Sequence, residues 1–346
     1  MKNKSRNLGL DLMRSLAISF VLISHYGFNP VKKILIGGIG VEVFFVLSGF
    51  LIGRILIRSF DEYKGFNTIK SFWINRWFRT IPLYYLALIV QIALSKGWNW
   101  GYMYYFLFLQ NNFFGISLYS ISWSLVIEEW FYLGLPLLFG LFQKRIKAQY
   151  IQLISLTIIS LIIFKFAFIE WKDIPFTGVK GNPLLRFDTM LFGVVLGWLF
   201  LKNNKLFVFL SNPVFFTFGF LGVCIINYVF FIQIGIDILN EFVMFKTLFL
   251  PVQSLLIAMC LPFLYNSKRL ERVLSRNGVI KALIVWTSIL SYSFYLFHQN
   301  INAFLRGYFS DLDSAIIALV VLYPFSYLLY VIYEKPLTSL REKFNK

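Results

Sequence analysis

The first apolar stretch of the chain, residues 8–26, carries three side chains that can hold charge or exchange protons: Asp11, Arg14 and His25. On a helix that turns about 100° per residue, Asp11 and Arg14 are neighbours one turn apart. His25 follows on the same stripe, roughly 16 Å along the axis from Arg14. Ionisable residues in membrane helices usually face a bundle interior or a water-filled cavity. The spacing predicts a polar stripe that ends at a buried histidine, although a helix-end ion pair plus one hydrogen-bonded core histidine gives the same pattern.

Four more charges lie beside or within apolar runs. Arg76 and Arg79 are three residues apart and share a helix face. Their guanidinium groups match phosphate oxygens in geometry, but arginines also anchor the cytoplasmic ends of spans. Glu128 and Glu129 are adjacent, so on a helix they point about 100° apart. At least one of them should be buried and either paired or protonated, and a structural pairing with Arg14 or Arg79 is the alternative to a catalytic role.

The remaining candidates lie in two other apolar stretches. Glu42 follows several glycines, and Gly49 lies further along the same apolar stretch. These small residues favour close helix packing. Its carboxylate is either a solvated structural group near the external interface or part of a site for an acceptor. His298 follows Tyr295 by one helical turn and is the only histidine besides His25. Both histidines therefore fall within predicted membrane spans.

The composition of the 346-residue chain is that of a membrane protein. Hydrophobic residues make up 58% of the chain and charged residues only 14%, whereas soluble domains are near one half and one quarter. Apolar windows of about 20 residues predict an all-α, polytopic membrane helix bundle of about ten transmembrane helices. We expect residues 101–116 to be a loop or a short re-entrant segment. The predicted spans lie near residues 10–28, 37–57, 77–95, 121–142, 150–169, 186–201, 211–232, 242–265, 284–305 and 314–333.

The net charge of +17 does not indicate a nucleic-acid partner, because lysines and arginines lie between apolar runs rather than on one soluble face. Most of them lie in the segments that ten spans would place on the same side as both termini. The positive-inside rule then puts both termini in the cytoplasm of a multi-pass inner-membrane protein. Cys224 and Cys260 both lie in apolar runs, so no disulfide framework is predicted, and no metal site is expected.

Taken in order, these stretches resemble the motifs of the acyltransferase-3 family of integral membrane O-acyltransferases. Arg14 and His25 stand at the spacing that the family shows in its first helix. The Arg-x-x-Arg motif is similar to the segment around Arg76 and Arg79, and a Trp-Ser-Leu block leads to Glu128. The resembling segments outside the first helix are residues 40–52, 76–84, 123–132, 291–298 and 334–336.

The resemblance implies a single transmembrane acyltransferase domain over residues 1–346, without the C-terminal extracytoplasmic domain that some members carry. It implies transfer of an acyl group, most often acetyl, from cytoplasmic acyl-CoA to a hydroxyl of an extracytoplasmic sugar, such as a surface polysaccharide or its lipid-linked precursor. Acetyl-CoA would be the donor substrate, and no permanently bound cofactor is expected. The expected partners are therefore acyl-CoA, a carbohydrate acceptor and the lipid bilayer.

Within this resemblance, His25 and Glu128 are the expected catalytic residues. His25 would act as general base on the acceptor hydroxyl, and Glu128 would orient it or stabilise its charge. Direct transfer and transfer through a covalent acyl-enzyme both fit. The expected CoA-binding residues are Arg14, Arg76 and Arg79, the supporting residues are Asp11, Arg14, Trp123 and Glu129, and the acceptor-side residues are Glu42, Tyr295 and His298.

A secondary transporter or flippase is the alternative from another class. In it, His25, Glu128 and Arg14 would relay protons or substrate across the membrane. Transporters commonly show internal repeats, and the sequence has none that we detect. The order of the motifs therefore favours the acyltransferase.

Overall fold

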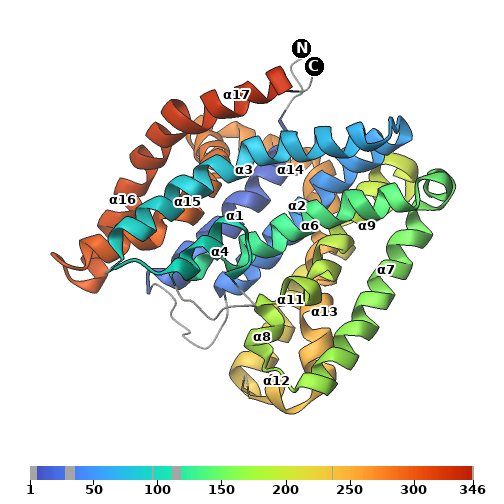
Figure 1. Cartoon of the computed structure of the whole chain (residues 1–346), viewed down its shortest axis with the longest axis horizontal. Coiled ribbons are helices and arrows are strands. Elements are labelled where there is room, and N and C mark those ends of the chain that lie inside the picture. The colour runs from blue at the N-terminus through green and yellow to red at the C-terminus, as the bar shows by residue number, and fades with distance from the viewer. Residues whose placement is uncertain (1–5, 28–35, 96, 111–117, 236, 345–346) are drawn as a thin grey trace. The chain divides into compact units, whose positions relative to one another are not determined.

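The computed structural model describes residues 6–27, 36–95, 97–110, 118–235 and 237–344. Within these ranges all regular structure is helical and no strand is present. This confirms the predicted all-α fold, and Figure 1 shows the helices in chain order.

Nine helical segments in the described ranges are long and apolar enough to cross a membrane. Three of them continue through a short neighbouring helix, since η2 precedes α6, η4 follows α11, and η5 and α17 follow α16. The main helices are α1 (Leu8–His25), α2 (Ile36–Asp61), α3 (Phe66–Leu94), α6 (Trp123–Leu141), α7 (Gln143–Lys172), α11 (Pro213–Tyr228), α13 (Val243–Asn266), α15 (Gly278–Leu305) and α16 (Asp311–Leu329).

The sixth predicted span, residues 186–201, forms α9 (Phe187–Lys202), which has only 16 residues. At about 1.5 Å per residue, α9 is roughly 24 Å long and falls short of a hydrocarbon core of about 30 Å. Most of its side chains are buried within the protein. Its apolar character therefore reflects packing against other helices as much as contact with lipid.

Short helices connect these segments. The predicted re-entrant stretch, residues 101–116, contains only brief turns up to residue 110, and residues 111–117 lie outside the described ranges. The short elements are η1 (Trp100–Tyr102), α4 (Met103–Phe106), η2 (Ser120–Ser122), α8 (Phe176–Gly181), η3 (Pro183–Leu185), α10 (Asn204–Phe209), η4 (Val229–Gln233), α12 (Ile238–Glu241), α14 (Lys268–Arg276), η5 (Tyr330–Glu334) and α17 (Lys335–Phe344).

The chain forms two compact units, and each takes up several separate pieces of sequence. The unit boundaries fall inside α2, α7, α8, α9 and α15, so these helices contribute to both units. Unit 1 comprises residues 1–54, 154–176 and 188–291, and unit 2 comprises residues 55–153, 177–187 and 292–346.

In unit 1, α2 and α9 approach each other through two glycines. A Cβ atom added to Gly49 would lie 1.9 Å from the carbonyl oxygen of Met190, and one added to Gly193 would lie 2.1 Å from that of Val46. Small residues at helix interfaces allow backbones to come this close. The packing role predicted for Gly49 is confirmed.

Unit 1 also contains an ion pair that the sequence did not indicate. Lys165 on α7 donates a hydrogen bond to Asp188 on α9, and both side chains are fully buried. Removing one partner of such a pair leaves an uncompensated charge, which is strongly unfavourable in an apolar interior. This pair therefore fixes how the unit 1 part of α7 sits against α9.

Gly49→Ala is expected to lower the stability of the protein, because the added methyl group would overlap the carbonyl oxygen of Met190. Overpacking of this kind typically costs about 1–3 kcal/mol. Gly134→Ala on α6 is the matched control: its Cβ would have its nearest neighbour 3.9 Å away, so its stability should stay the same or rise. Thermal unfolding of both variants in one detergent is the measurement. Equal stabilities would contradict the close helix approach.

Candidate active site

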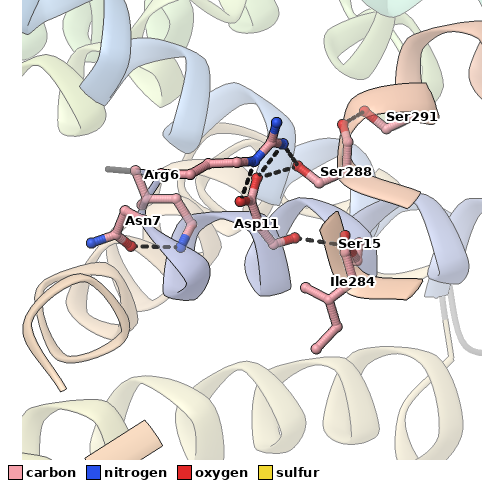
Figure 2. A network of polar contacts seen from close by, with 8 residues as sticks. Arg6, Asn7, Asp11, Ser15, Ile284, Ser288 and Ser291 are labelled. Atoms are coloured by element: carbon pink, nitrogen blue, oxygen red, sulfur yellow. Dashed lines mark hydrogen bonds and ion pairs between the residues drawn. The ribbon is translucent and has the colours of Figure 1, made fainter. Parts of the chain in front are cut away.

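Asp11 is the centre of a polar network in unit 1, which Figure 2 shows. Arg6 binds both oxygens of the buried carboxylate, through Nε at 2.6 Å and Nη2 at 2.7 Å. The hydroxyl of Ser288 on α15 donates to Oδ1 of Asp11 at 2.6 Å. The helix-end ion pair therefore exists, but its cation is Arg6 from the preceding segment. Asp11 acts as a structural anchor of α1.

Three further contacts fix the first half of α1 in unit 1, and Figure 2 shows Asn7, Ser15 and Ile284. The Asn7 side chain caps the helix by accepting from the amide of Leu10, and it donates to the carbonyl of Tyr265. The Ser15 hydroxyl is 2.7 Å from the carbonyl oxygen of Ile284 on α15. These bonds set the rotation of α1 and so the direction in which half-buried Arg14 projects.

His25 is the last residue of α1, and its side chain is exposed. His25 is therefore not buried among other helices of the protein, because the helix ends at this residue, and its burial in the bilayer stays a prediction. Tyr26 caps α1 with a bond from its amide to Leu22, and Gly27 turns the chain with a φ of +79°. Tyr26 is the buried side chain at this end of the helix, with 3% exposure. An exposed imidazole at the end of a span is accessible to a substrate.

Glu42 lies in α2 and is buried, with 2% exposure. Its carboxylate accepts a 2.9 Å hydrogen bond from the Ser254 hydroxyl on α13, also in unit 1. The alternative of a solvated carboxylate is therefore wrong. A role for Glu42 on the acceptor side stays a prediction.

In unit 2, Arg76 and Glu128 meet at the hydroxyl of Tyr132. Arg76 donates to this hydroxyl at 2.5 Å, and the hydroxyl donates to Oε2 of Glu128 at 2.8 Å. The guanidinium also stacks on the Tyr132 ring at 4.1 Å and lies 3.7 Å from Glu128. Glu128 is thus paired with Arg76, whereas the structural alternative had named Arg14 or Arg79. Tyr132, four residues after Glu128, was missed, although the i, i+4 spacing was a visible signal.

The two arginines of α3 have different surroundings. The helix begins at Phe66, well before the predicted start at residue 77, so Arg76 and Arg79 lie within it rather than at its end. Arg76 is largely buried, whereas Arg79 is exposed and interacts electrostatically with Glu334. The guanidinium of Arg79 is therefore more accessible to an anionic ligand than that of Arg76.

Glu129 points away from Glu128 into the interior of unit 2, as the helical spacing predicted. Its exposure is 4%, and its Oε1 accepts a 2.9 Å hydrogen bond from the Thr80 hydroxyl on α3. The carbonyl of Thr80 in turn accepts a 2.9 Å bond from the Tyr292 hydroxyl. Thr80 therefore links Glu129 to α3 and to α15, and neither Thr80 nor Tyr292 was a sequence candidate.

His298 is fully buried, and its Nδ1 lies 3.0 Å and 2.8 Å from the carbonyl oxygens of Phe294 and Tyr295. Because carbonyl oxygens only accept, Nδ1 carries the proton in this arrangement. The Tyr295 hydroxyl donates to the Ile121 carbonyl at 2.7 Å and also lies 2.7 Å from Ser124. Tyr295 thus ties α15 to the start of α6 in unit 2. Acceptor-side roles for His298 and Tyr295 stay predictions.

The start of α6 is fixed by aromatic residues. The ammonium of Lys180 lies 4.9 Å from the ring centre of Trp123, the first residue of α6. Just before the span, the Tyr119 hydroxyl donates to the carbonyl of Leu296. Burial raises the pKa of the Tyr119 phenol well above its usual range, so the phenol stays a donor at physiological pH. Lys180 thus contacts the first residue of α6, and the supporting role expected for Trp123 stays a prediction.

The fold and these clusters define a multi-pass α-helical membrane protein with arginine and carboxylate side chains inside its spans. In the described part of the chain, no group of three or more His, Cys, Asp or Glu residues could hold a metal ion. The chain belongs to the acyltransferase-3 family, whose model, described as an acyltransferase domain, matches residues 7–334. The resemblance of its motifs to that family is therefore confirmed.

Several characterised or named proteins are similar to this chain. It is 29% identical over 218 residues to the peptidoglycan O-acetyltransferase OatA of Listeria monocytogenes, covering 56% of this chain and 34% of OatA. It is 27% identical over 335 residues to a candidate O-acetyltransferase of Staphylococcus aureus, covering 88% of this chain and 52% of that protein. It is 27% identical over 323 residues to YrhL of Bacillus subtilis, named as a candidate peptidoglycan O-acetyltransferase, covering 85% of this chain and 48% of YrhL. The chain thus spans about half the length, or less, of these relatives, and no solved structure matches it.

Tyr132→Phe is expected to destabilise unit 2, because it removes the hydroxyl shared by Arg76 and Glu128. Hydrogen bonds to charged groups contribute about 1.5–3 kcal/mol, so a clear drop in the unfolding temperature should follow. Tyr308→Phe is the matched control, since Tyr308 is 72% exposed. Thermal unfolding in detergent compares the two. A Tyr132→Phe protein as stable as the control would mean that the shared hydroxyl contributes nothing.

Proposed function

We propose that this chain is an O-acetyltransferase that moves an acetyl group from cytoplasmic acetyl-CoA to a hydroxyl of an extracytoplasmic sugar. The observation that carries the proposal is the α3–α6 cluster of unit 2, where exposed Arg79 lies one turn from largely buried Arg76 and its carboxylates. Family membership supports the reaction type. A surface polysaccharide is the proposed acceptor class, and peptidoglycan is the acceptor printed in the names of two relatives.

The proposal includes a location and an orientation. The protein would lie in the cytoplasmic (inner) membrane. Both termini would lie in the cytoplasm if the short helix α9 crosses the membrane in addition to the nine long segments, and lysines and arginines concentrate in the segments that this topology places on that side. The first turns of α3 mix polar and apolar residues, and they extend the helix before the predicted span begins at residue 77. These turns would present Arg79 to a donor that arrives from the cytoplasm.

The proposed chemistry assigns His25 as general base. Its imidazole takes the proton from the acceptor hydroxyl while the hydroxyl oxygen attacks the thioester carbonyl. The bond between the carbonyl carbon and sulfur then breaks, and the CoA thiolate leaves as a thiol after it takes the proton from the imidazolium. The exposure of His25 supports its access to substrate. The role of Glu128 as the charge partner of His25, and the role of Arg14 in donor binding, stay predictions.

The reaction can be tested on purified protein in detergent. Acetyl-CoA hydrolysis and transfer of labelled acetyl to added glycan fragments are measured together. Slow hydrolysis without an acceptor and faster acetyl loss with one would support the proposal. A protein that binds and consumes no acetyl-CoA under conditions where it stays folded would overturn it.

Arg79→Lys is expected to weaken CoA binding by about tenfold, because lysine keeps the charge but loses the planar fork for phosphate oxygens. The exposure of Arg79 makes normal folding the expected result. Arg276→Lys, at an exposed arginine in α14, is the matched control and should bind CoA as the parent does. Isothermal titration of CoA into each protein measures the difference. Equal affinities for all three proteins would make Arg79 only a membrane anchor.

His25→Asn is expected to fold and bind acetyl-CoA but to lose acetyl transfer by about 10²–10⁴-fold. Asparagine retains part of the hydrogen bonding of histidine but cannot take a proton near neutral pH. His298→Asn, at the only other histidine, is the control and should lose much less transfer, since an amide can replace the Nδ1–H donor. Transfer, binding and unfolding are measured on the same preparations. Near-parental transfer by His25→Asn would rule out the proposed base.

A further inference from the structure

Glu129 has one oxygen in use and one that is available for a ligand. Oε1 accepts from Thr80, whereas Oε2 is buried and has no hydrogen-bond partner among the residues that the structure describes. Leaving a buried carboxylate oxygen without a donor is costly, so such atoms normally bond to a protein group, water or ligand. The residue as a whole is 96% buried, since its exposure is 4%. The unfilled position therefore calls for an N–H or O–H donor.

A buried N–H group without a hydrogen-bond acceptor among the described residues lies in the same cluster. Arg76 uses Nη2 to bind Tyr132, but its Nε–H is buried and has no acceptor within the described ranges. Arg76 and Glu129 interact electrostatically, and the Thr80 hydroxyl links them, at 3.3 Å from the Arg76 carbonyl and 2.9 Å from Glu129. One cluster in unit 2 thus offers a buried, unfilled hydrogen-bond acceptor and a buried, unfilled hydrogen-bond donor.

A secondary amide has the complementary pair of groups, one N–H and one C=O. The amide is uncharged, so it enters a buried environment far more cheaply than a charged group does. The pantetheine arm of CoA contains two such amides between its phosphates and its thiol. An alcohol would satisfy only one of the two protein groups unless it acted as donor and acceptor at a single atom.

We infer that Glu129 Oε2 and Arg76 Nε bind an amide of the pantetheine arm of the acyl donor. This inference rests on the proposed function, because it takes CoA as the donor carrier. Arg79 would bind the phosphates outside, and the Glu129–Arg76 pair would hold the neutral arm within the span. Glu129 is then a binding residue for the arm, while its neighbour Glu128 is held by Tyr132 and Arg76.

The test compares two ligands on the intact protein in detergent. One is CoA, and the other is adenosine 3′-phosphate 5′-diphosphate, which has every phosphate of CoA but no pantetheine arm. Glu129→Leu should weaken CoA binding about 10- to 100-fold, the range for hydrogen bonds to a charged group, and leave nucleotide binding unchanged. Arg79→Lys should weaken both ligands. Asn302→Leu is the matched control, since Asn302 also has a buried, unpartnered oxygen in unit 2, and it should affect neither ligand.

Glu129→Gln decides the matter if the leucine variant does not fold, because glutamine keeps the shape and one acceptor oxygen. Its loss should be smaller than that of leucine and again confined to CoA. A Glu129 variant that weakens both ligands equally, or neither, overturns the inference and leaves a water molecule as the occupant of the position. A parent protein that binds the nucleotide and CoA equally well also overturns it, while the donor proposal survives. A parent that binds neither ligand overturns the donor proposal itself.

Discussion

Charge pairing inside apolar helices is the constraint on which both units depend. A charged side chain within a span is stable only when a counter-charge and hydrogen bonds replace the water that it loses. The chain meets this requirement locally, with Arg6 on Asp11 and Lys165 on Asp188 in unit 1, and with Arg76 on Glu128 in unit 2. The Lys165–Asp188 pair joins α7 to α9 and the Arg76–Glu128 pair joins α3 to α6, so these two pairs select packing partners that hydrophobicity alone would leave interchangeable.

Hydropathy and helical spacing predicted the class of fold because the bilayer requires long apolar helices. The same reasoning was less accurate for α3 and α9. The first turns of α3, which mix polar and apolar residues, form a regular helix because backbone hydrogen bonding does not require a continuous apolar run, so the helix starts at Phe66. By contrast, most of α9 is buried within the protein, and with 16 residues it is shorter than the nine long segments.

Pairing partners could not be predicted, since a helical period gives the face of a residue but not the element opposite to it. Sequence spacing correctly separated Glu128 from Glu129, whose directions depend on one helix alone. It could not show that Glu128 meets Arg76 through Tyr132, or that Arg6 binds Asp11, because the α3–α6 contact joins residues 52 positions apart and the Arg6 segment precedes the helix. His25 appeared buried among other helices for a related reason: apolar residues surround it in sequence, but the helix ends there.

The different exposure of the two α3 arginines also bears on what kind of donor unit 2 can accept. A phosphate carries a charge that is most stable near water, so exposed Arg79 suits it. Burying the phosphate beside Glu129 would add a desolvation cost without a free counter-charge. An uncharged arm carries no such cost, and it could satisfy the buried oxygen of Glu129 and the buried Nε of Arg76 at once. Along one face of α3, the guanidinium of Arg79 is exposed and that of Arg76 is largely buried. This arrangement favours a ligand that is anionic at one end and neutral, but polar, at the other. A free anion such as inorganic phosphate has a group only for the exposed arginine, whereas the proposed nucleotide-linked thioester has groups for both the exposed and the buried positions.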